Sequence, residues 1–250
     1  MGARERRGAA HSLKPFGIRV RADLGGRLLR RYKRFLADVE TDTGEKLTVH
    51  CPDPGSLRGT ARPGVRVRCS TSDNPKRKLR HTLEMIRNGR IWVGVHPGRA
   101  NDVAARALSA GALAELSGYA VHEREVVACP GSRLDFRLSG HSDDPRDAWV
   151  EVKSVSMADG DTARFPDSVT ARGRKHLETL LRLHQEGARA ALVYLVQRAD
   201  CDRVEAAEAI DPAYAAALRR AAQGGVEVFA LGARITAREI RVERRLPVLL

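Results

Sequence analysis

Residues 132–138 read SRLDFRL, and residues 149–153 read WVEVK. In both segments apolar side chains alternate with polar ones, which is the period-two pattern of half-buried strands. Residues 139–147 join the two segments and are rich in Ser, Asp, Gly and Pro, a composition typical of turns. The sequence therefore predicts a β-hairpin, around which the rest of the fold is arranged.

Three polar side chains of this hairpin are predicted to meet on one side of the sheet. Glu151 and Lys153 are two residues apart on one strand, so they share a face. Asp135 lies on the partner strand and points to its polar side. Two carboxylates are a minimal Mg²⁺ site, and a lysine can stabilise negative charge that develops on a phosphoryl group. The alternative is a cross-strand ion pair on a solvated face.

The positive charge of the chain is concentrated in its first part. The 250 residues carry a formal net charge of +13. Residues 1–90 contain 22 Lys and Arg against 9 Asp and Glu, whereas the remaining residues contain 22 of each sign. A basic module beside a neutral one indicates polyanion binding; arginine-rich composition or a membrane-surface patch are the alternatives. Aromatic residues make up only 4%, which argues against a surface built mainly on base stacking.

The cysteines and the hydropathy pattern indicate in which cellular compartment the protein is expected. The four cysteines form no C-x-x-C pair, so neither a zinc knuckle nor a disulfide framework is expected. No apolar segment follows the N-terminal arginines as in a secretory leader, and no run of about 18 apolar residues suggests a membrane span. We therefore expect a cytoplasmic protein without a membrane partner.

Residues 18–96 have the pattern of a small β-barrel, preceded by a basic tail over 1–17 that is predicted to be disordered. Five or so short alternating strands, separated by turns, carry outward basic side chains. A barrel of the OB type presents such a face and its loops to a nucleic-acid strand. The side chains expected to bind phosphates are Arg30, Arg31, Lys33, Arg34, Lys76, Arg77 and Lys78.

Residues 97–250 are predicted to form one mixed α/β domain. The expected order is a helix capped by Asn101 and Asp102, three strands, a long helix over 168–186, a buried strand over 190–196, and a further helix and strand.

The long helix carries candidate contacts near its start. Asp167 is expected to cap the helix or to interact with its dipole. Arg172 and Lys175 could contact a phosphate beside the metal, or could simply face solvent. His176 is expected to be an ordinary helix residue.

The order of elements, with Asp135 on the second strand and Glu151-x-Lys153 on the third, resembles the PD-(D/E)xK nuclease superfamily. Nearly the whole chain after residue 17 further resembles the sugar fermentation stimulation protein A (SfsA) family. The segments that carry this resemblance are RYKRFLADV at 31–39, HCPDPG at 50–55, TSDNPKRK at 71–78, SRLDF at 132–136, VEVKSV at 150–155 and FPDSVT at 165–170.

The resemblance implies an N-terminal OB-like domain, a C-terminal nuclease-like domain, and DNA binding without strong sequence preference. It also implies cleavage that depends on Mg²⁺ or Mn²⁺, and an older role of the family is regulation of sugar-utilisation genes. The chain departs from the family pattern in three places: Leu134 precedes Asp135 where a proline is usual, and Arg106 and Ala171 replace helix glutamates. The Arg106 replacement puts metal affinity in doubt unless Glu115 or Glu123 substitutes.

The sequence thus predicts a DNA-binding protein whose catalytic residues are Asp135, Glu151 and Lys153, with the two carboxylates holding the metal. The first alternative is a non-enzymatic DNA-binding regulator on a degenerate nuclease fold. A ribosome- or RNA-associated factor is a more remote alternative. RNA as the ligand and a homodimer as the assembly stay open at this point.

Overall fold

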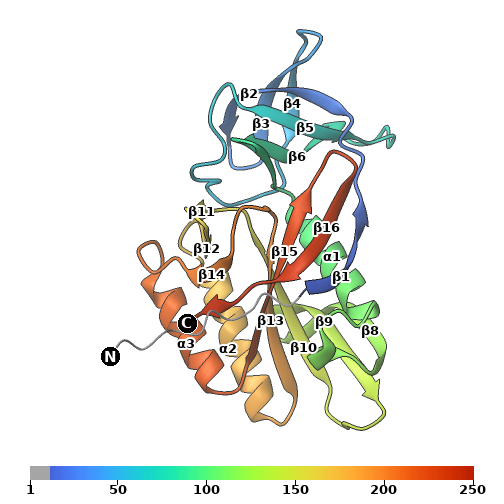
Figure 1. The fold of residues 1–250 in the computed structure, drawn as a ribbon, viewed down its shortest axis with the longest axis vertical. Coiled ribbons are helices and arrows are strands. Elements are labelled where there is room, and N and C mark those ends of the chain that lie inside the picture. The colour runs from blue at the N-terminus through green and yellow to red at the C-terminus, as the bar shows by residue number, and fades with distance from the viewer. Residues whose placement is uncertain (1–11) are drawn as a thin grey trace.

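Short alternating strands in the first part of the chain close into a barrel, which lies at the top of Figure 1. The computed structural model describes residues 12–250. The barrel strands follow the order β4-β3-β2-β5-β6-β7, and a β4–β6 pairing at His50 and Thr82 joins the ends. Alternating apolar side chains such as Leu28, Val39 and Val67 fill its interior. The strands are β2 (Leu24–Tyr32), β3 (Leu36–Thr41), β4 (Lys46–His50), β5 (Arg66–Thr71), β6 (His81–Asn88) and β7 (Ile91–Gly94).

The rest of the chain forms an α/β domain around a seven-stranded mixed sheet. The strand order is β1-β16-β15-β13-β10-β9-β8, with β13 parallel to both β10 and β15. Since β13 is central, its continuous apolar run is buried on both faces. The strands are β1 (Ser12–Arg19), β8 (Tyr119–Cys129), β9 (Ser132–His141), β10 (Ala148–Val155), β13 (Arg189–Val196), β15 (Glu227–Ile235) and β16 (Glu239–Arg245).

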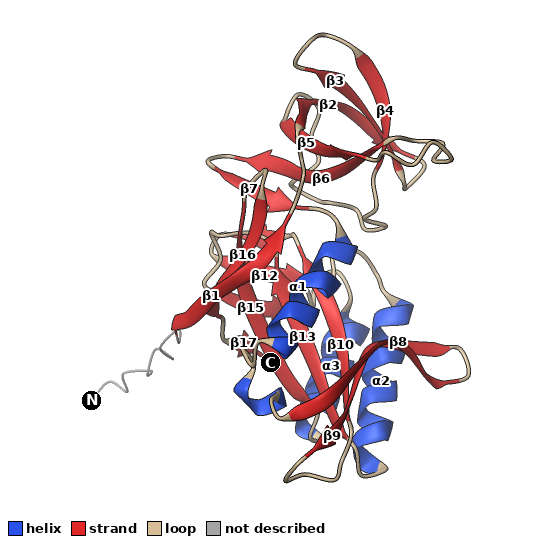
Figure 2. Cartoon of the chain, turned by 90° about the vertical axis from the view of Figure 1, so that its right-hand side faces the viewer, coloured by secondary structure: helices blue, strands red, loops and turns tan. Residues whose placement is uncertain are grey.

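Helices cover both faces of this sheet. Helix α1 (Pro97–Ser109) packs on one face, and α2 (Ala171–Gln185) and α3 (Pro212–Gln223) pack on the other, as Figure 2 shows from the side. A short 3₁₀ helix, η1 (Ala114–Leu116), follows α1. The predicted mixed α/β class, with a small β-barrel before an α/β domain, is confirmed.

A second, small sheet of four strands was not predicted. It lies beside the start of α2, and its strands are only two to four residues long. Such short segments have too few residues to show a period-two pattern. They are β11 (Ala158–Asp159), β12 (Thr162–Phe165), β14 (Arg203–Ala206) and β17 (Val248–Leu249).

The N-terminal segment corrects the expectation of a disordered tail over 1–17. Residues 12–19 form β1, which pairs antiparallel with β16 at the edge of the large sheet. Phe16 and Ile18 pack against the core of the α/β domain, so this strand belongs to that domain although the barrel follows it in sequence. The expectation for residues 1–11 lies outside the described residues.

Two predicted helix caps are wrong. Helix α1 begins at Pro97, because proline is well suited to the first helical position, so Asn101 and Asp102 lie inside the helix. Helix α2 begins after Thr170, whose Oγ1 accepts a hydrogen bond from the Gly173 amide at 3.0 Å, so Asp167 is not its cap. Asn101 and Asp167 have other partners, described below.

A buried ion pair fixes the barrel to the first helix of the α/β domain. Arg99 of α1 donates two hydrogen bonds to the carboxylate of Glu84 on β6, the shorter at 2.7 Å. The Glu84 side chain is almost completely buried and also accepts from Ser70 Oγ at 2.8 Å. A buried carboxylate is tolerated only when paired in this way, so the contact constrains how the two domains sit.

Within residues 12–250, no helix combines the length and apolar character needed to cross a membrane.

Candidate functional site

The pairing of the predicted hairpin ends at Phe136, and Asp135 is the residue directly before it in sequence. Strands β9 and β10 pair from Leu138 opposite Ala148 to Phe136 opposite Val150. Beyond that point the Asp135 Oδ2 atom accepts a hydrogen bond from the Val152 amide at 2.7 Å. A carboxylate thus takes the place of a main-chain acceptor, which fixes Asp135 beside Glu151.

Asn101 holds the other oxygen of the same carboxylate. Its Nδ2 atom donates to Asp135 Oδ1 at 2.6 Å from inside α1. The residue expected to cap the helix therefore orients a candidate metal ligand. Asp135 has donors from two different elements, so its position is well defined before any ligand binds.

Glu151 is the most buried member of the site, with 3% of its surface exposed. Its Oε1 atom accepts from Lys153 Nζ at 2.5 Å and from His176 Nδ1. Its Oε2 atom is buried and has no hydrogen-bond partner among the described residues. A buried carboxylate oxygen without a donor is unfavourable, so this atom is poised for a cation or a water.

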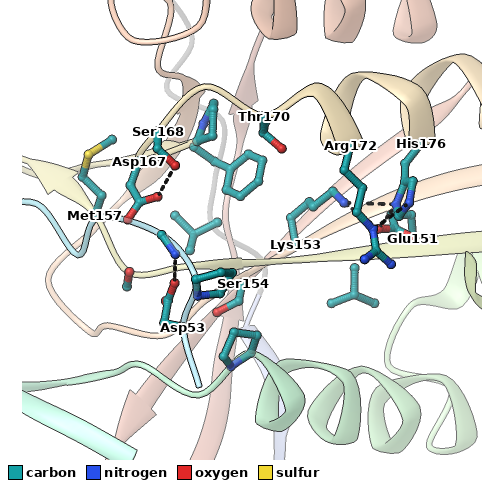
Figure 3. A pocket seen from close by; sticks show the side chains of 18 of the residues that line it. Asp53, Glu151, Lys153, Ser154, Met157, Asp167, Ser168, Thr170, Arg172 and His176 are labelled. Carbon is teal, nitrogen blue, oxygen red and sulfur yellow. Dashed lines mark hydrogen bonds and ion pairs between the residues drawn. The ribbon is translucent and has the colours of Figure 1, made fainter. Parts of the chain in front are cut away.

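His176 is the functional side chain that sequence reasoning missed. Figure 3 shows it with Arg172 beside Glu151 and Lys153. Arg172 Nε donates to His176 Nε2 at 3.3 Å, so the neutral ring carries its proton on Nδ1 and donates to Glu151. The ring is 4% exposed and lies on the buried face of α2. Its contact with β10 joins residues 25 apart in sequence, which a helical pattern does not reveal.

The two carboxylates differ in their affinity for protons. Burial, and then the nearby charge of Glu151, raises the pKa of Asp135 to about 6. Burial also opposes ionisation of Glu151, but the charge of Lys153 and the His176 hydrogen bond outweigh it and lower the pKa of that carboxyl. The site therefore concentrates negative charge in a poorly solvated place, which is a setting that attracts a cation.

These residues line a cavity of about 730 Å³ between the two domains. The sheet and α2 contribute Asp135, Glu151 and Lys153 together with His176. The barrel contributes Arg34 and the loop after β4, including Asp53. Figure 3 shows Asp53 on the opposite side of this cavity from Glu151 and Lys153. The candidate site is therefore completed by the domain that was predicted to bind nucleic acid.

Asp167 joins the two domains instead of capping α2. Its Oδ2 atom accepts from the Leu57 amide at 2.8 Å, and its carbonyl accepts from Ser56 Oγ at 2.8 Å. The approach is so close that a Cβ atom at Gly55 would lie 2.3 Å from Asp167 Oδ1. The loop after β4 is thus held against the segment before α2, and one wall of the cavity is fixed.

Asp53 carries a carboxylate whose charge is unfavourable in the folded protein. Burial raises its pKa to about 6, a backbone hydrogen bond opposes this, and the Asp167 charge adds to the rise. Because the folded-state pKa exceeds the unfolded one, ionised Asp53 costs stability above pH 6, and this cost fades as the pH falls through 6 toward 4.

We expect Asp53→Asn to raise the free energy of unfolding at pH 8 by about 1–2 kcal/mol. The amide can still accept from the Gly55 amide, which Asp53 Oδ1 does at 2.7 Å. Thermal unfolding at pH 8 and pH 5 measures the effect, and the gain should shrink at the lower pH. Asp73→Asn, in an exposed loop, is the control and should change neither value. An equal gain in stability at both pH values would contradict the raised pKa of Asp53.

Arg31 differs in role from the other basic residues of its segment. Its Nη2 atom donates to the carbonyls of Arg34 at 2.8 Å and Asp53 at 2.6 Å, and its Nε donates to Cys51 Sγ. The guanidinium thus ties the β2–β3 turn to the loop that walls the cavity. Arg31 was predicted as a phosphate contact, but its donors on these two nitrogens are engaged within the protein.

We expect Arg31→Ala to lower the free energy of unfolding by about 2 kcal/mol, because two backbone carbonyls lose a charged donor. Lys33→Ala, two residues away on an exposed side chain, should leave stability unchanged and weaken polyanion binding instead. Chemical denaturation of the two variants tests the difference. Equal stability of both variants would show that Arg31 is not a structural tie.

The other predicted phosphate contacts lie on exposed surface. Arg30 pairs with Asp38 at 2.7 Å and lies over the Tyr32 ring, so it is partly neutralised. Lys175 donates to the Gly131 carbonyl at 2.8 Å and does not line the cavity that holds Asp135 and Glu151. The remaining exposed members are Lys33, Arg34, Lys76, Arg77, Lys78 and Arg172.

No other glutamate takes the place in the cavity of the helix glutamates that Arg106 and Ala171 replace, among the residues that the structure describes. Arg106 is exposed in the last turn of α1. Glu115 pairs with Arg245 at 2.8 Å and Glu123 faces Arg137 at 3.6 Å, and neither lines the cavity in the described part of the chain. Glu125 does line it, but is paired with Arg133. The cavity therefore offers Asp135 and Glu151 as its central acidic pair.

Comparison with known proteins accounts for both domains. A family model described as "Sugar fermentation stimulation protein RE domain" matches residues 98–239, and one described as "SfsA N-terminal OB domain" matches residues 29–95. The sugar fermentation stimulation protein homologue of Geobacter sulfurreducens is 45% identical over 224 residues, covering 90% of this chain and 95% of that protein. The homologue of Halorhodospira halophila is 51% identical over 225 residues, covering 89% and 93%.

A solved structure has the same fold. The structure of Pyrococcus furiosus SfsA in complex with Ca²⁺ superposes with a TM-score of 0.84 at 25% sequence identity. The match covers 91% of this chain and 96% of that chain, so it includes both domains.

Proposed function

The chain belongs to the sugar fermentation stimulation protein family, and we propose that it is a nuclease that hydrolyses phosphodiester bonds with the help of a divalent cation. Its second domain is of the restriction endonuclease-like type. The observation that carries the proposal is the unpartnered, buried Oε2 atom of Glu151, in the same cavity as Asp135 and beside Lys153. Asp135 and Glu151 are too poorly solvated to be an ordinary pair of surface acids.

The donor set suits Mg²⁺ or Mn²⁺. Mg²⁺ is commonly held by one or two carboxylates, with substrate phosphate and water completing its shell. Asp135 and Glu151 would hold the ion. When bound, it would lower the pKa of a water and neutralise charge on the phosphate. The Ca²⁺ complex of the Pyrococcus relative supports divalent-cation binding in this family.

The protein side chains around this pair have separate tasks in the proposed reaction. Lys153, 2.5 Å from Glu151 Oε1, places a positive charge where the scissile phosphoryl oxygens gain negative charge. His176 fixes the rotamer of Glu151 through its Nδ1–H, and Asn101 does the same for Asp135. The loop with Asp53 forms the opposite side of the cavity.

We propose that the barrel supplies sequence-independent affinity for DNA. Lys33, Arg34, Lys76, Arg77 and Lys78 are exposed and sit in turns, where they can reach successive phosphates. Binding of this kind releases counterions, so the logarithm of the affinity should fall linearly with the logarithm of salt concentration.

A non-enzymatic DNA-binding protein is the second candidate, and one observation favours it. Within residues 12–250, no group of three or more His, Cys, Asp or Glu side chains could hold a metal ion. A two-carboxylate site has lower affinity than a larger one, and Arg106 does not add a ligand. This candidate predicts salt-dependent binding with no cleavage under any metal condition.

The experiment that separates the two is cleavage of end-labelled oligonucleotides and supercoiled plasmid by the full chain. Reactions contain Mg²⁺, Mn²⁺ or EDTA, and RNA of the same sequence is run in parallel. The proposal predicts cleavage with Mg²⁺ or Mn²⁺ and none with EDTA. Binding without any metal-dependent cleavage would favour the non-enzymatic candidate.

A further inference from the structure

The turn between β2 and β3 has a backbone that is unfavourable for its residues. Lys33 and Arg34 have φ angles of +45° and +65°, the left-handed region that glycine occupies without cost. Two consecutive charged residues in this region are unusual, and such strain is found where side chains have a task. Arg31 holds the turn in this shape through the Arg34 carbonyl. The fixed backbone of this turn therefore holds the side chains of Lys33 and Arg34 in defined directions.

The residue that follows is an exposed aromatic ring. Phe35 is 43% exposed and is absent from the barrel core. Its ring lies 6.4 Å from the ring of His50, centroid to centroid, with a tilt of 30°. An isolated exposed apolar side chain would need no explanation, but this one directly follows two exposed basic residues, Lys33 and Arg34.

Arg77 lies next to this pair of rings. Its Nη2 atom donates to Thr82 Oγ1 at 2.9 Å, and Thr82 pairs with His50 across β4 and β6. The charge of Arg77 also contributes, after burial, to lowering the pKa of His50. A cation beside an exposed aromatic ring allows a nucleotide to be bound through both its base and its phosphate.

Phe35 follows a residue of the cavity wall in sequence. Arg34 precedes Phe35 and lines the same cavity as Asp135 and Glu151. A strand whose base lies on Phe35 would therefore have its neighbouring phosphate close to Arg34 and its continuation directed toward the candidate catalytic pair.

We propose that Phe35 stacks on an unpaired base, and that the substrate of this site is a single-stranded polynucleotide. The proposal rests on the proposed function for the fate of the strand, but the binding step does not depend on cleavage. In a duplex both faces of an internal base are covered by its neighbours, so a ring on a turn can stack only on a base in a single strand or at an end. The low aromatic content of the chain agrees with stacking at one position and phosphate contacts elsewhere.

The test measures binding by fluorescence anisotropy, with EDTA present so that no strand is cut. The full chain is titrated against a labelled single-stranded DNA of mixed sequence, the same sequence in RNA, and the DNA duplex with each end closed by a non-nucleotide linker, which covers the terminal base pairs. The variants are Phe35→Ala, Phe35→Leu and Phe35→Trp. Val121→Ala, which shortens an exposed side chain on β8, is the matched control.

We expect Phe35→Ala and Phe35→Leu to weaken single-strand binding about 10-fold, because base–aromatic stacking is lost in both. Phe35→Trp should retain it, Val121→Ala should have no effect, and duplex affinity should not change. The comparison of DNA with RNA shows which sugar the site accepts.

The proposal is overturned if Phe35→Leu binds single strands as tightly as the unmodified chain, or if duplex binding falls equally. Failure of the unmodified chain to bind any single strand would overturn it too. A Phe35-dependent single-strand complex in a chain that never cleaves would instead leave this inference standing and remove the proposed hydrolysis.

Discussion

Replacing Asp135 by alanine is expected to reduce the rate of metal-dependent cleavage about 10²–10³-fold, the size of effect seen when one preorganised electrostatic group is removed from an active site. Asp135 supplies one carboxylate of the central acidic pair, and it is held by Val152 and Asn101 before any ligand binds. Without it, Glu151 alone cannot retain the cation next to the phosphate.

The variant should bind DNA normally, because the barrel residues are unchanged. Asp147→Ala is the matched control, since Asp147 is a surface carboxylate paired with Arg137 at 2.7 Å beside the start of β10. The loss should therefore appear in the cleavage rate and in divalent-cation affinity measured by calorimetry. Full activity in Asp135→Ala would remove this residue from the site.

Replacing His176 by alanine is expected to reduce cleavage about 10–100-fold, as commonly happens when the partner that orients a metal ligand is lost. His176 donates to Glu151 Oε1 and accepts from Arg172, so the alanine variant frees Glu151 to rotate. It also leaves Lys153 as the remaining donor to that oxygen among the described residues. We regard His176 as a positioning residue, because its ring contacts Glu151 and not the reacting atoms.

His176→Asn separates positioning from a general loss of stability. The shorter amide can still donate to Glu151, so this variant should recover part of the activity and of the cation affinity. Thermal unfolding of both variants shows whether the fold is intact. If alanine and asparagine behave alike in activity, while both fold normally, the hydrogen bond to Glu151 has no part in cleavage.

The local periodicity of the sequence was sufficient for the main elements of the fold. Alternation over 132–138 and 149–153 predicted β9 and β10, and the apolar run over 190–196 predicted the central strand β13. The same alternation predicted that Glu151 and Lys153 share a face, as their 2.5 Å contact requires. These features depend only on residues close together in sequence.

The parts that were missed depend on contacts between distant segments. Residues 12–19 pair with β16, more than 200 residues away, and a basic composition concealed the alternation of Phe16 and Ile18. Asn101 and Asp167 are typical capping residues, but each forms a hydrogen bond with a residue distant in sequence. Asn101 donates to Asp135, and Asp167 accepts from the Leu57 amide in the barrel loop. His176 likewise gains its role only when α2 packs on β10.

The role of Arg31 shows a related limit. In sequence it is one of four cations within five residues, all of which suit a phosphate-binding strand. Only the folded backbone shows that two carbonyl oxygens, of Arg34 and Asp53, lie within reach of its guanidinium. Charge composition therefore could not show which of these cations maintains the shape of the turn.

The most direct test of the proposed site is the cleavage rate of a labelled single-stranded oligonucleotide at increasing Mn²⁺ concentration, for the unmodified chain and for Glu151→Gln. The substitution keeps the size of a side chain that is 3% exposed, but removes its charge and one of its two acceptor oxygens. We predict saturable, metal-dependent cleavage by the unmodified chain, and none above the metal-only background by the variant. Equal rates for the two proteins, or cleavage that persists in EDTA, would contradict the assignment of this cavity as a metal-dependent nuclease site.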